Sequence, residues 1–148
     1  MSNEAHVRKM FAQATFIRDL GMELTGIGDG WCETALTPKA NHMQQHGFAH
    51  AAVVTALADH TAGCAAGTAL GPGQDVITVE IKVSFLRPAA AAQLRARGKV
   101  LRAGKNLIFA ESEVYGVQGA EEKLIAKAMA TLSVIPNETI ERMRPSQV

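Results

Sequence analysis

The sequence is short of net charge, aromatic side chains and cysteine. Its 148 residues carry a formal charge of only +1, whereas a dedicated nucleic-acid-binding domain is usually strongly basic. One Trp and one Tyr provide no aromatic platform for nucleic-acid bases. Cys32 and Cys64 fit neither a metal-binding spacing nor a disulfide framework, which favours a reducing compartment. These deficits favour a cytoplasmic protein whose partner is not a nucleic acid.

No targeting signal is recognisable either. The stretch MSNEAHVRKMF carries charges of both signs and lacks the apolar run of a signal peptide. Residues 47–70 are long enough to cross a bilayer and contain a close-packing GxxxG step from Gly63 to Gly67. Asp59 would lie near the centre of such a span, however, where insertion costs about 2.5–3.5 kcal/mol. We expect no membrane partner, and we expect the small residues to let a soluble helix pack closely.

The hydrophobic pattern predicts one α+β domain covering residues 1–148. Residues 4–19 have the periodicity of an N-terminal amphipathic helix, residues 48–67 form a long Ala-rich helix, and residues 136–148 form a short charged tail. Asp29-Gly30 is a turn signal between two alternating arms. Four more strands are expected within residues 76–86, 91–103, 106–117 and 122–135. In the first of them the alternation places five apolar residues on one face: Ile77, Val79, Ile81, Val83 and Phe85.

The long helix constrains the architecture because it is apolar on most of its circumference and needs cover on more than one side. A strongly twisted antiparallel sheet of about six strands can wrap around it. Such a sheet still leaves a face and an edge that require a partner. The sequence therefore predicts self-association, as a homodimer or a homotetramer.

Charge is almost missing from the long helix and the loop before it. From Ala40 to Gln74 the one charged side chain is Asp59, although a fifth of the whole chain is charged. An isolated acid of this kind can be a solvent-facing residue or part of a functional site. The surrounding residues decide between these interpretations.

The stretch QQHGFAHAAVVTALADHTAGCAA resembles the signature of hotdog-fold thioesterases of the phenylacetate-pathway (PaaI-like) type. The matching positions are Gln44, Gly47, His50 and Asp59, and the stretch TVEIKVSFLRPA, which opens at Thr78, resembles a strand of the same family. The resemblance covers about residues 20–135. It implies a hotdog fold, an acyl-CoA substrate with an aromatic or medium-chain acyl group, and no cofactor.

The resemblance also implies a site shared between two protomers, with Asp59 and Thr78 from one and Gln44 and Ala51 from the other. The sequence departs from the family where a Gly-Gly pair usually follows the His, because Ala51-Ala52 stands there. The backbone N–H of Ala51 can still donate a hydrogen bond. The two methyl groups, with Gly47 beside them, are expected to narrow the choice of substrate.

The residues themselves suit thioester hydrolysis. Asp59 can act as a base or a nucleophile, and the N–H of Ala51 in the first turn of the helix can stabilise an oxyanion. Gln44 can hold the carbonyl or orient water, and His50 at the helix start has an orienting role. Ala51 and Asp59 are eight residues apart, which is about 12 Å along a helix. Both must reach one carbonyl group, so one helix cannot supply both and two antiparallel copies can.

A run without acidic residues from Ile81 to Ala110 carries seven cations. Three of them, Arg87, Arg102 and Lys105, are candidate substrate-binding residues, because coenzyme A carries a pyrophosphate and a 3′-phosphate that a positive surface attracts. RNA is the alternative ligand of such a surface, although aromatic side chains are scarce.

Three other functions remain open at this point. His42, His46 and His50 recur every fourth residue, as metal ligands on a helix do, but Gly47 interrupts a helix there. We therefore expect no metal. A hotdog dehydratase or hydratase would pair an acid with a His in a pattern that is not found after Asp59. A non-catalytic acyl-CoA-binding protein would bind the same ligand without turnover.

Overall fold

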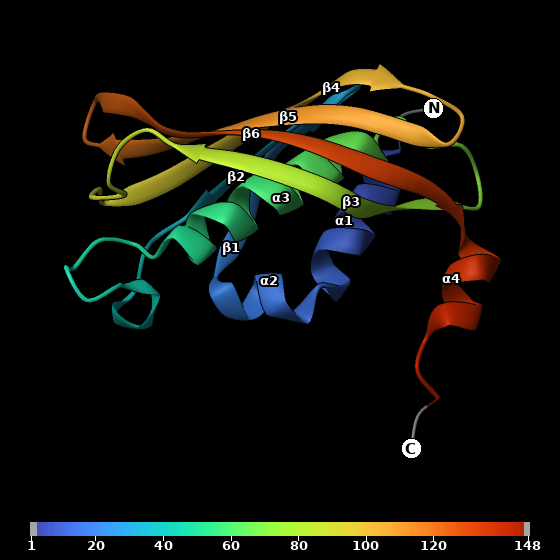
Figure 1. The fold of residues 1–148 in the computed structure, drawn as a ribbon, viewed down its shortest axis with the longest axis horizontal. Coiled ribbons are helices and arrows are strands. Elements are labelled where there is room, and N and C mark those ends of the chain that lie inside the picture. Colours follow the sequence, from blue (N-terminus) through green and yellow to red (C-terminus); the bar gives the residue numbers. More distant parts are fainter. Residues whose placement is uncertain (1–2, 147–148) are drawn as a thin grey trace.

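A six-stranded antiparallel sheet in the order β1-β2-β4-β5-β6-β3 forms the frame of the protein. In the computed structural model, which describes residues 3–146, the sheet curves over one long helix (Figure 1). The strands are β1 Met22–Gly28, β2 Trp31–Leu36, β3 Gln74–Phe85, β4 Gln93–Ala103, β5 Leu107–Gln118 and β6 Glu121–Pro136. The helices are α1 Glu4–Gln13, α2 Thr15–Leu20, α3 Ala51–Gly67 and α4 Asn137–Met143, and a 3₁₀ turn spans Ala40–His42.

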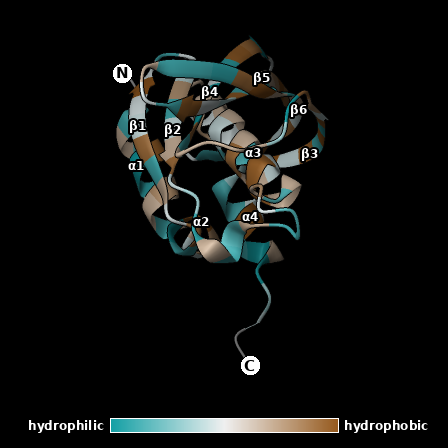
Figure 2. Cartoon of the chain, turned by 90° about the vertical axis from the view of Figure 1, so that its left-hand side faces the viewer, coloured by the Kyte–Doolittle hydropathy of each residue, from teal (hydrophilic) through white to brown (hydrophobic). Residues whose placement is uncertain are grey.

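Helix α3 is the centre of the core, as the sequence predicted. Ten of its 17 residues are buried, and they contact β2 and the central strands on one side and α1 on the other. Figure 2 shows α3 enclosed between the curved sheet and the shorter helices. The prediction of an α+β fold with a wrapped central helix is therefore confirmed. None of the helices in residues 3–146 is long and apolar enough to span a bilayer.

Several predicted boundaries were wrong. The N-terminal helix is interrupted at Ala14, whose backbone is not helical (φ −76°, ψ 89°), so that α1 and α2 are separate. Helix α3 begins at Ala51 rather than near residue 48, because His50 is extended and caps the helix with its side chain. Within the predicted tail 136–148, residues 137–143 form α4. Periodicity does not reveal a one-residue break or a short exposed helix.

The alternation predicted along β3 also fails, at a β-bulge between Thr78 and Glu80. Thr78 pairs with Leu132 and Ile81 pairs with Ala130, and both partners on β6 are buried. Since paired side chains in an antiparallel sheet lie on the same face, Thr78 faces the core together with Ile81. Ile77 and Val79, predicted to share that face, are exposed instead. The bulge thus turns a polar residue toward α3.

Gly98 marks the point where α3 lies closest to the sheet. A Cβ atom at this position would lie 2.7 Å from the carbonyl oxygen of Thr61. We expect Gly98→Ala to lower the free energy of unfolding by about 1–3 kcal/mol through overpacking, measured by denaturant unfolding. Gly63→Ala is the matched control, because a Cβ there would meet Leu132 at 3.9 Å and alanine favours a helix. Equal stability of the two variants would contradict the close approach.

Candidate active site

The lone carboxylate of α3 has one neutral hydrogen-bond partner. The hydroxyl group of Thr78 donates a hydrogen bond of 2.9 Å to Oδ1 of the half-buried Asp59. This bond depends on the β3 bulge, which directs Thr78 toward the helix. Asp59 forms no ion pair with any cation of residues 3–146. One carboxylate oxygen is thereby held in place while the other can act as a base or nucleophile.

The neighbouring histidine does not supply a countercharge. Burial lowers the pKa of His60, although the negative charge of Asp59 acts in the opposite direction. The ring of His60 packs against Phe11 of α1, with ring centroids 5.1 Å apart. A neutral His60 leaves the charge of Asp59 uncompensated from this side.

A tight loop places Gln44 in front of α3. The bridge between Met43 and Ala49 closes the loop, and the N–H of Gly47 donates to the carbonyl oxygen of Gln44 at 3.0 Å. Gly47 has a φ of +82°, a conformation that favours glycine. The side-chain oxygen of Gln44 accepts a hydrogen bond from the N–H of His46. This contact leaves the side-chain NH₂ of Gln44 as a donor.

The first turn of α3 presents a free backbone donor. Nδ1 of His50 accepts a hydrogen bond of 2.9 Å from the N–H of Ala52. The N–H of Ala51 has no acceptor among the residues that the structure describes. Because Nδ1 of His50 accepts, the neutral ring carries its proton on Nε2. The N-terminus of α3, which is the positive end of the helix dipole, thus combines a histidine held by a hydrogen bond with the free backbone N–H of Ala51.

Gln44, His50 and Ala51 line a cavity of about 590 Å³. Most of its wall is apolar and comes from the end of β3, the following loop and the helix. The apolar wall residues are Phe48, Val54, Phe85, Leu86, Pro88 and Ile125. They come from three separate segments, so the sequence did not indicate that they line one site; Phe85 was expected on an apolar strand face only. An apolar wall with a few convergent polar groups is typical of a small-molecule site.

The two halves of the candidate site lie apart within one chain. Asp59 and Thr78 do not line the cavity. Ala51 and Asp59 both belong to α3 and are eight positions apart, so the helix separates them by about 12 Å along its axis. The sheet separates them as well. Thr78 is in register with Ala103 at one end of the sheet, whereas Arg87 bonds to Leu124 near the other end.

The candidate substrate-binding residues occupy different places. Arg87 lies at the rim of the cavity, where its guanidinium donates 2.7 Å to the carbonyl oxygen of Leu124. Ala52 faces a second hollow of about 420 Å³ on the other side of the helix start, beside His50. Arg102 and Lys105 are exposed at the Thr78 end of the sheet. One chain therefore does not bring Arg102 and Lys105 together with Arg87.

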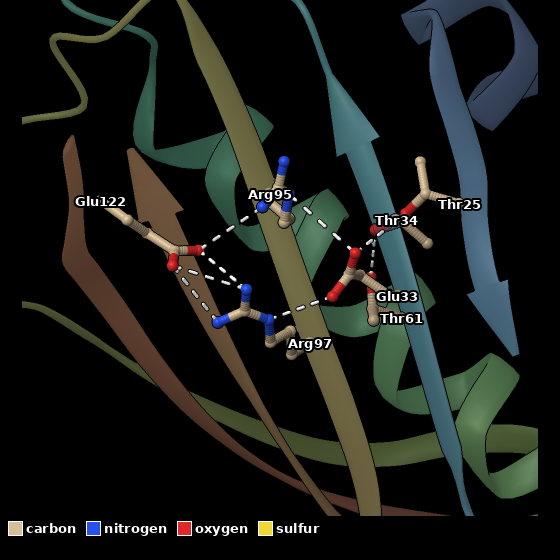
Figure 3. A network of polar contacts seen from close by, with 7 residues as sticks. All are labelled: Thr25, Glu33, Thr34, Thr61, Arg95, Arg97 and Glu122. Atoms are coloured by element: carbon tan, nitrogen blue, oxygen red, sulfur yellow. Dashed lines mark hydrogen bonds and ion pairs between the residues drawn. The ribbon is translucent and has the colours of Figure 1, made fainter. Parts of the chain in front are cut away.

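Part of the basic run is neutralised by acids on neighbouring strands. Figure 3 shows Arg95 and Arg97 between Glu33 and Glu122, with Arg97 Nε 3.0 Å from Glu33 Oε2. Lys99 likewise lies 3.0 Å from Glu111 on β5. The hydrogen bonds from Lys127 and Lys99 lower the pKa of Glu111. Within residues 3–146 the cations of the run without an acidic partner are Lys82, Arg87, Arg102 and Lys105.

The three histidines of the metal hypothesis do not share a helix. His42 is buried at the 3₁₀ turn and accepts from the N–H of Lys39, His46 lies in the following turn, and His50 caps α3. No three His, Cys, Asp or Glu side chains in the described part of the chain are grouped so as to hold a metal ion. The two cysteines lie together in the core, where a hydrogen bond with Cys32 and burial raise the pKa of the Cys64 thiol.

Comparisons with known proteins agree with the geometry. The chain shares 33% identity with a thioesterase family protein from Silicibacter pomeroyi, with a TM-score of 0.86 over 88% of this chain and 96% of that one. It shares 29% identity with the proofreading thioesterase EntH from Cronobacter turicensis, over 71% of this chain and 77% of the relative. A phenylacetic acid degradation-related protein from Ralstonia eutropha has the same fold, with a TM-score of 0.75, 24% identity and coverage of 86% and 98%.

The open six-stranded sheet around a central helix, shared with these structures, defines a hotdog fold. The sequence model of the thioesterase superfamily matches residues 46–123, more than half of the chain, and this chain belongs to that superfamily. The superfamily predicted from the signature around Asp59 is confirmed. Its activity as a thioester hydrolase follows from membership and from relatives that include a Haemophilus influenzae thioesterase, 26% identical over 87% of each chain with a TM-score of 0.78.

Proposed function

We propose that the protein hydrolyses acyl-CoA thioesters with an aromatic or medium-chain acyl group at a site shared by two protomers. The observation that carries the proposal is the separation on α3 of the Asp59 carboxylate from the free N–H of Ala51. Each protomer offers both halves of a thioesterase site in places that do not meet. An antiparallel second copy brings the Asp59 half of one chain to the Gln44 half of its partner.

The edge strand β3 supports this dimer. Its outer edge has no neighbour among the described strands, and it is 12 residues long. Four large apolar side chains at or near this edge are more than 40% exposed: Ile77, Val79, Phe85 and Leu86. A long apolar edge strand is a template for pairing with another chain. Antiparallel pairing of two copies would place the Thr78 end of one β3 beside the cavity end of the other.

The chemistry follows from this arrangement. The thioester carbonyl oxygen accepts from the N–H of Ala51 and the side-chain NH₂ of Gln44, which stabilise the developing oxyanion. Asp59, held by Thr78, either takes a proton from a water whose oxygen adds to the carbonyl carbon, or adds its own oxygen and forms an anhydride that water cleaves. The C–S bond breaks, and the sulfur leaves as a thiolate that takes up a proton. Both routes consume one water and give a free acid and CoA.

Arg87, at the rim of the cavity, provides a test of whether the protein binds the CoA part of the substrate. We expect Arg87→Glu to raise KM for an acyl-CoA about tenfold or more, with kcat little changed, because a remote phosphate contact contributes uniform binding. KM for a truncated acyl thioester without the nucleotide should stay the same. Steady-state kinetics with both substrates make the comparison. Equal effects on the two thioesters would mean that Arg87 supports the loop through Leu124 instead.

Arg102 and Lys105 are proposed to bind CoA at the cavity of the partner protomer. In an antiparallel dimer their end of the sheet lies beside the partner's cavity end, so the same pair of substrates applies to Arg102→Glu. If Arg102→Glu leaves both KM values unchanged while Arg87→Glu does not, the phosphate-binding role belongs to Arg87 and not to Arg102.

A non-catalytic acyl-CoA-binding protein and a hotdog dehydratase or hydratase are the alternatives. A screen of acyl-CoA thioesters that detects released thiol separates the three. Hydrolysis releases CoA thiol, binding alone leaves the thioester intact, and a hydratase changes the acyl chain without releasing thiol. We propose further a single domain over residues 1–148, a cytoplasmic homodimer or homotetramer, and catalysis without a cofactor.

A further inference from the structure

Three buried hydroxyl groups lie in the contact between α3 and the sheet, on either side of Asp59. Ser112 of β5, 1% exposed, donates a hydrogen bond of 2.8 Å to the carbonyl oxygen of Ala58. Thr61, fully buried, donates 2.6 Å to the carbonyl oxygen of Leu57. Thr61 therefore accepts the 2.7 Å bond that joins it to Thr34 of β2, which Figure 3 shows. The sheet thus bonds to α3 immediately before Asp59, through Ser112, and two residues after it, through Thr34.

The rest of this contact is apolar, and large buried side chains such as Leu57, Leu94 and Leu132 pack in it beside small ones. Small side chains on both sides allow the close approach seen at Gly98, where the helix backbone almost touches the strand. The helix contributes Ala58, Ala62, Ala65 and Ala66, and the sheet contributes Ala96, Gly98, Ala110, Ala126, Ala128 and Ala130. Apolar burial is non-directional, and the alanines around Ala58 form only shallow ridges and grooves. Where these alanines meet, apolar packing defines the axial position of α3 less sharply than a directional hydrogen bond does.

We propose that Ser112 is a positioning residue for catalysis, whose hydrogen bond to Ala58 fixes the axial position of α3 and thereby aims Asp59. This inference rests on the proposed role of Asp59. The next residue after Ala58 is Asp59 itself, so a shift of the helix passes directly to the carboxylate and to its 2.9 Å contact with Thr78. A displacement of about 1 Å in a reacting group can reduce a rate by about 100-fold.

A merely structural role would look different. The Ala58 carbonyl has two lone pairs and keeps its bond within α3 when Ser112 is changed, so Ser112→Ala leaves no buried acceptor without a partner. The substitution is therefore expected to disturb position more than stability. The Thr34–Thr61 pair holds the helix from the β2 side and limits the shift to a fraction of a turn.

The test is the kinetics of Ser112→Ala in the protein of residues 1–148. We expect kcat to fall about ten- to 100-fold, with KM for acyl-CoA within about twofold of the wild type. Ser112→Cys keeps nearly the same side-chain volume but has a weaker hydrogen-bond donor. Its kcat should lie between that of the wild type and that of Ser112→Ala. Ser112→Cys also provides the readout if the alanine variant does not fold.

Thr68→Val is the matched control at the other end of α3. The buried Thr68 hydroxyl donates to the carbonyl oxygen of Ala65 at 2.7 Å and accepts from the N–H of Gly30 at 2.8 Å. Thr68→Val removes this hydroxyl, so the backbone N–H of Gly30 loses its acceptor. The variant should therefore lower the melting temperature at least as much as Ser112→Ala does. It should leave kcat near the wild-type value, since Thr68 lies nine residues beyond Asp59.

Two outcomes would overturn the inference. One is a kcat within about twofold of the wild type in a folded Ser112 variant. The other is an equal fall in kcat for Ser112→Ala and Thr68→Val, which would indicate a general loss of stability. Failure of the proposed function gives a different result, because Asp59→Asn would then retain activity whatever Ser112 does.

Discussion

Replacing Asp59 by asparagine should lower kcat/KM for acyl-CoA about 10²–10⁴-fold without unfolding the protein, because the base or nucleophile is lost. Asparagine keeps a side-chain oxygen that can accept the hydrogen bond from Thr78, so the contact between α3 and β3 can persist. Release of CoA thiol measures the rate. Size-exclusion chromatography and thermal unfolding show whether the assembly is intact.

Asp75→Asn is the control for this charge change. Asp75 is a partly buried acid on the same edge strand, 3.8 Å from His6 and three residues before Thr78. Its loss removes an equal charge and should leave turnover near the wild-type level. If folded Asp59→Asn retains turnover similar to that of Asp75→Asn, Asp59 is neither the catalytic base nor the nucleophile.

Mixing two inactive variants should restore activity if the site is shared. Asp59→Asn lacks the carboxylate half, and Gln44→Ala lacks a donor whose loss costs about 10²–10³ in rate. In a mixed dimer one site carries both lesions and the other carries neither. Co-refolding equal amounts makes about half of the dimers mixed, so about a quarter of the wild-type activity should return. The measurement is thiol release after co-refolding, compared with each variant refolded alone.

The control for mixing uses both lesions on one chain. A double variant mixed with Asp59→Asn offers no intact site in any pairing and should remain inactive. Verified mixed dimers of the single variants that stay inactive would refute the shared site. In that case Asp59 and Gln44 of one chain would have to act together, across the 12 Å that α3 places between Ala51 and Asp59.

Much of this fold can be predicted from local patterns. The turn at Asp29-Gly30, the alternating strands and the long apolar helix all depend on neighbours within a few residues, so periodicity predicts them. The position of Asp59 in an uncharged helix, and its spacing from Gln44 and His50, likewise depend on sequence alone. These features were sufficient to predict the superfamily.

The contacts around Asp59 depend on strand pairing instead. An unbroken alternation along β3 would have directed Thr78 away from α3, and the bulge after Thr78 reverses this. Nothing in the local pattern marks the bulge, since it results from the register of β3 against β6. Strand pairing also determines which cations of the basic run are neutralised, because it places Arg97 and Lys99 opposite acids on β2 and β5.

The sequence by itself determined the two chemical halves of the candidate site: a lone carboxylate in mid-helix, and a loop with Gln44 followed by an amide-bearing helix start. Only the tertiary structure decided that Thr78 holds the carboxylate, that Phe85 and Leu86 line the cavity, and that Ser112 bonds to Ala58. The physical reason is the separation along the sequence of the residues that interact. Helix and strand periodicity reflect interactions over a few residues, whereas these contacts join segments 19 to 54 residues apart that only the packed sheet brings together.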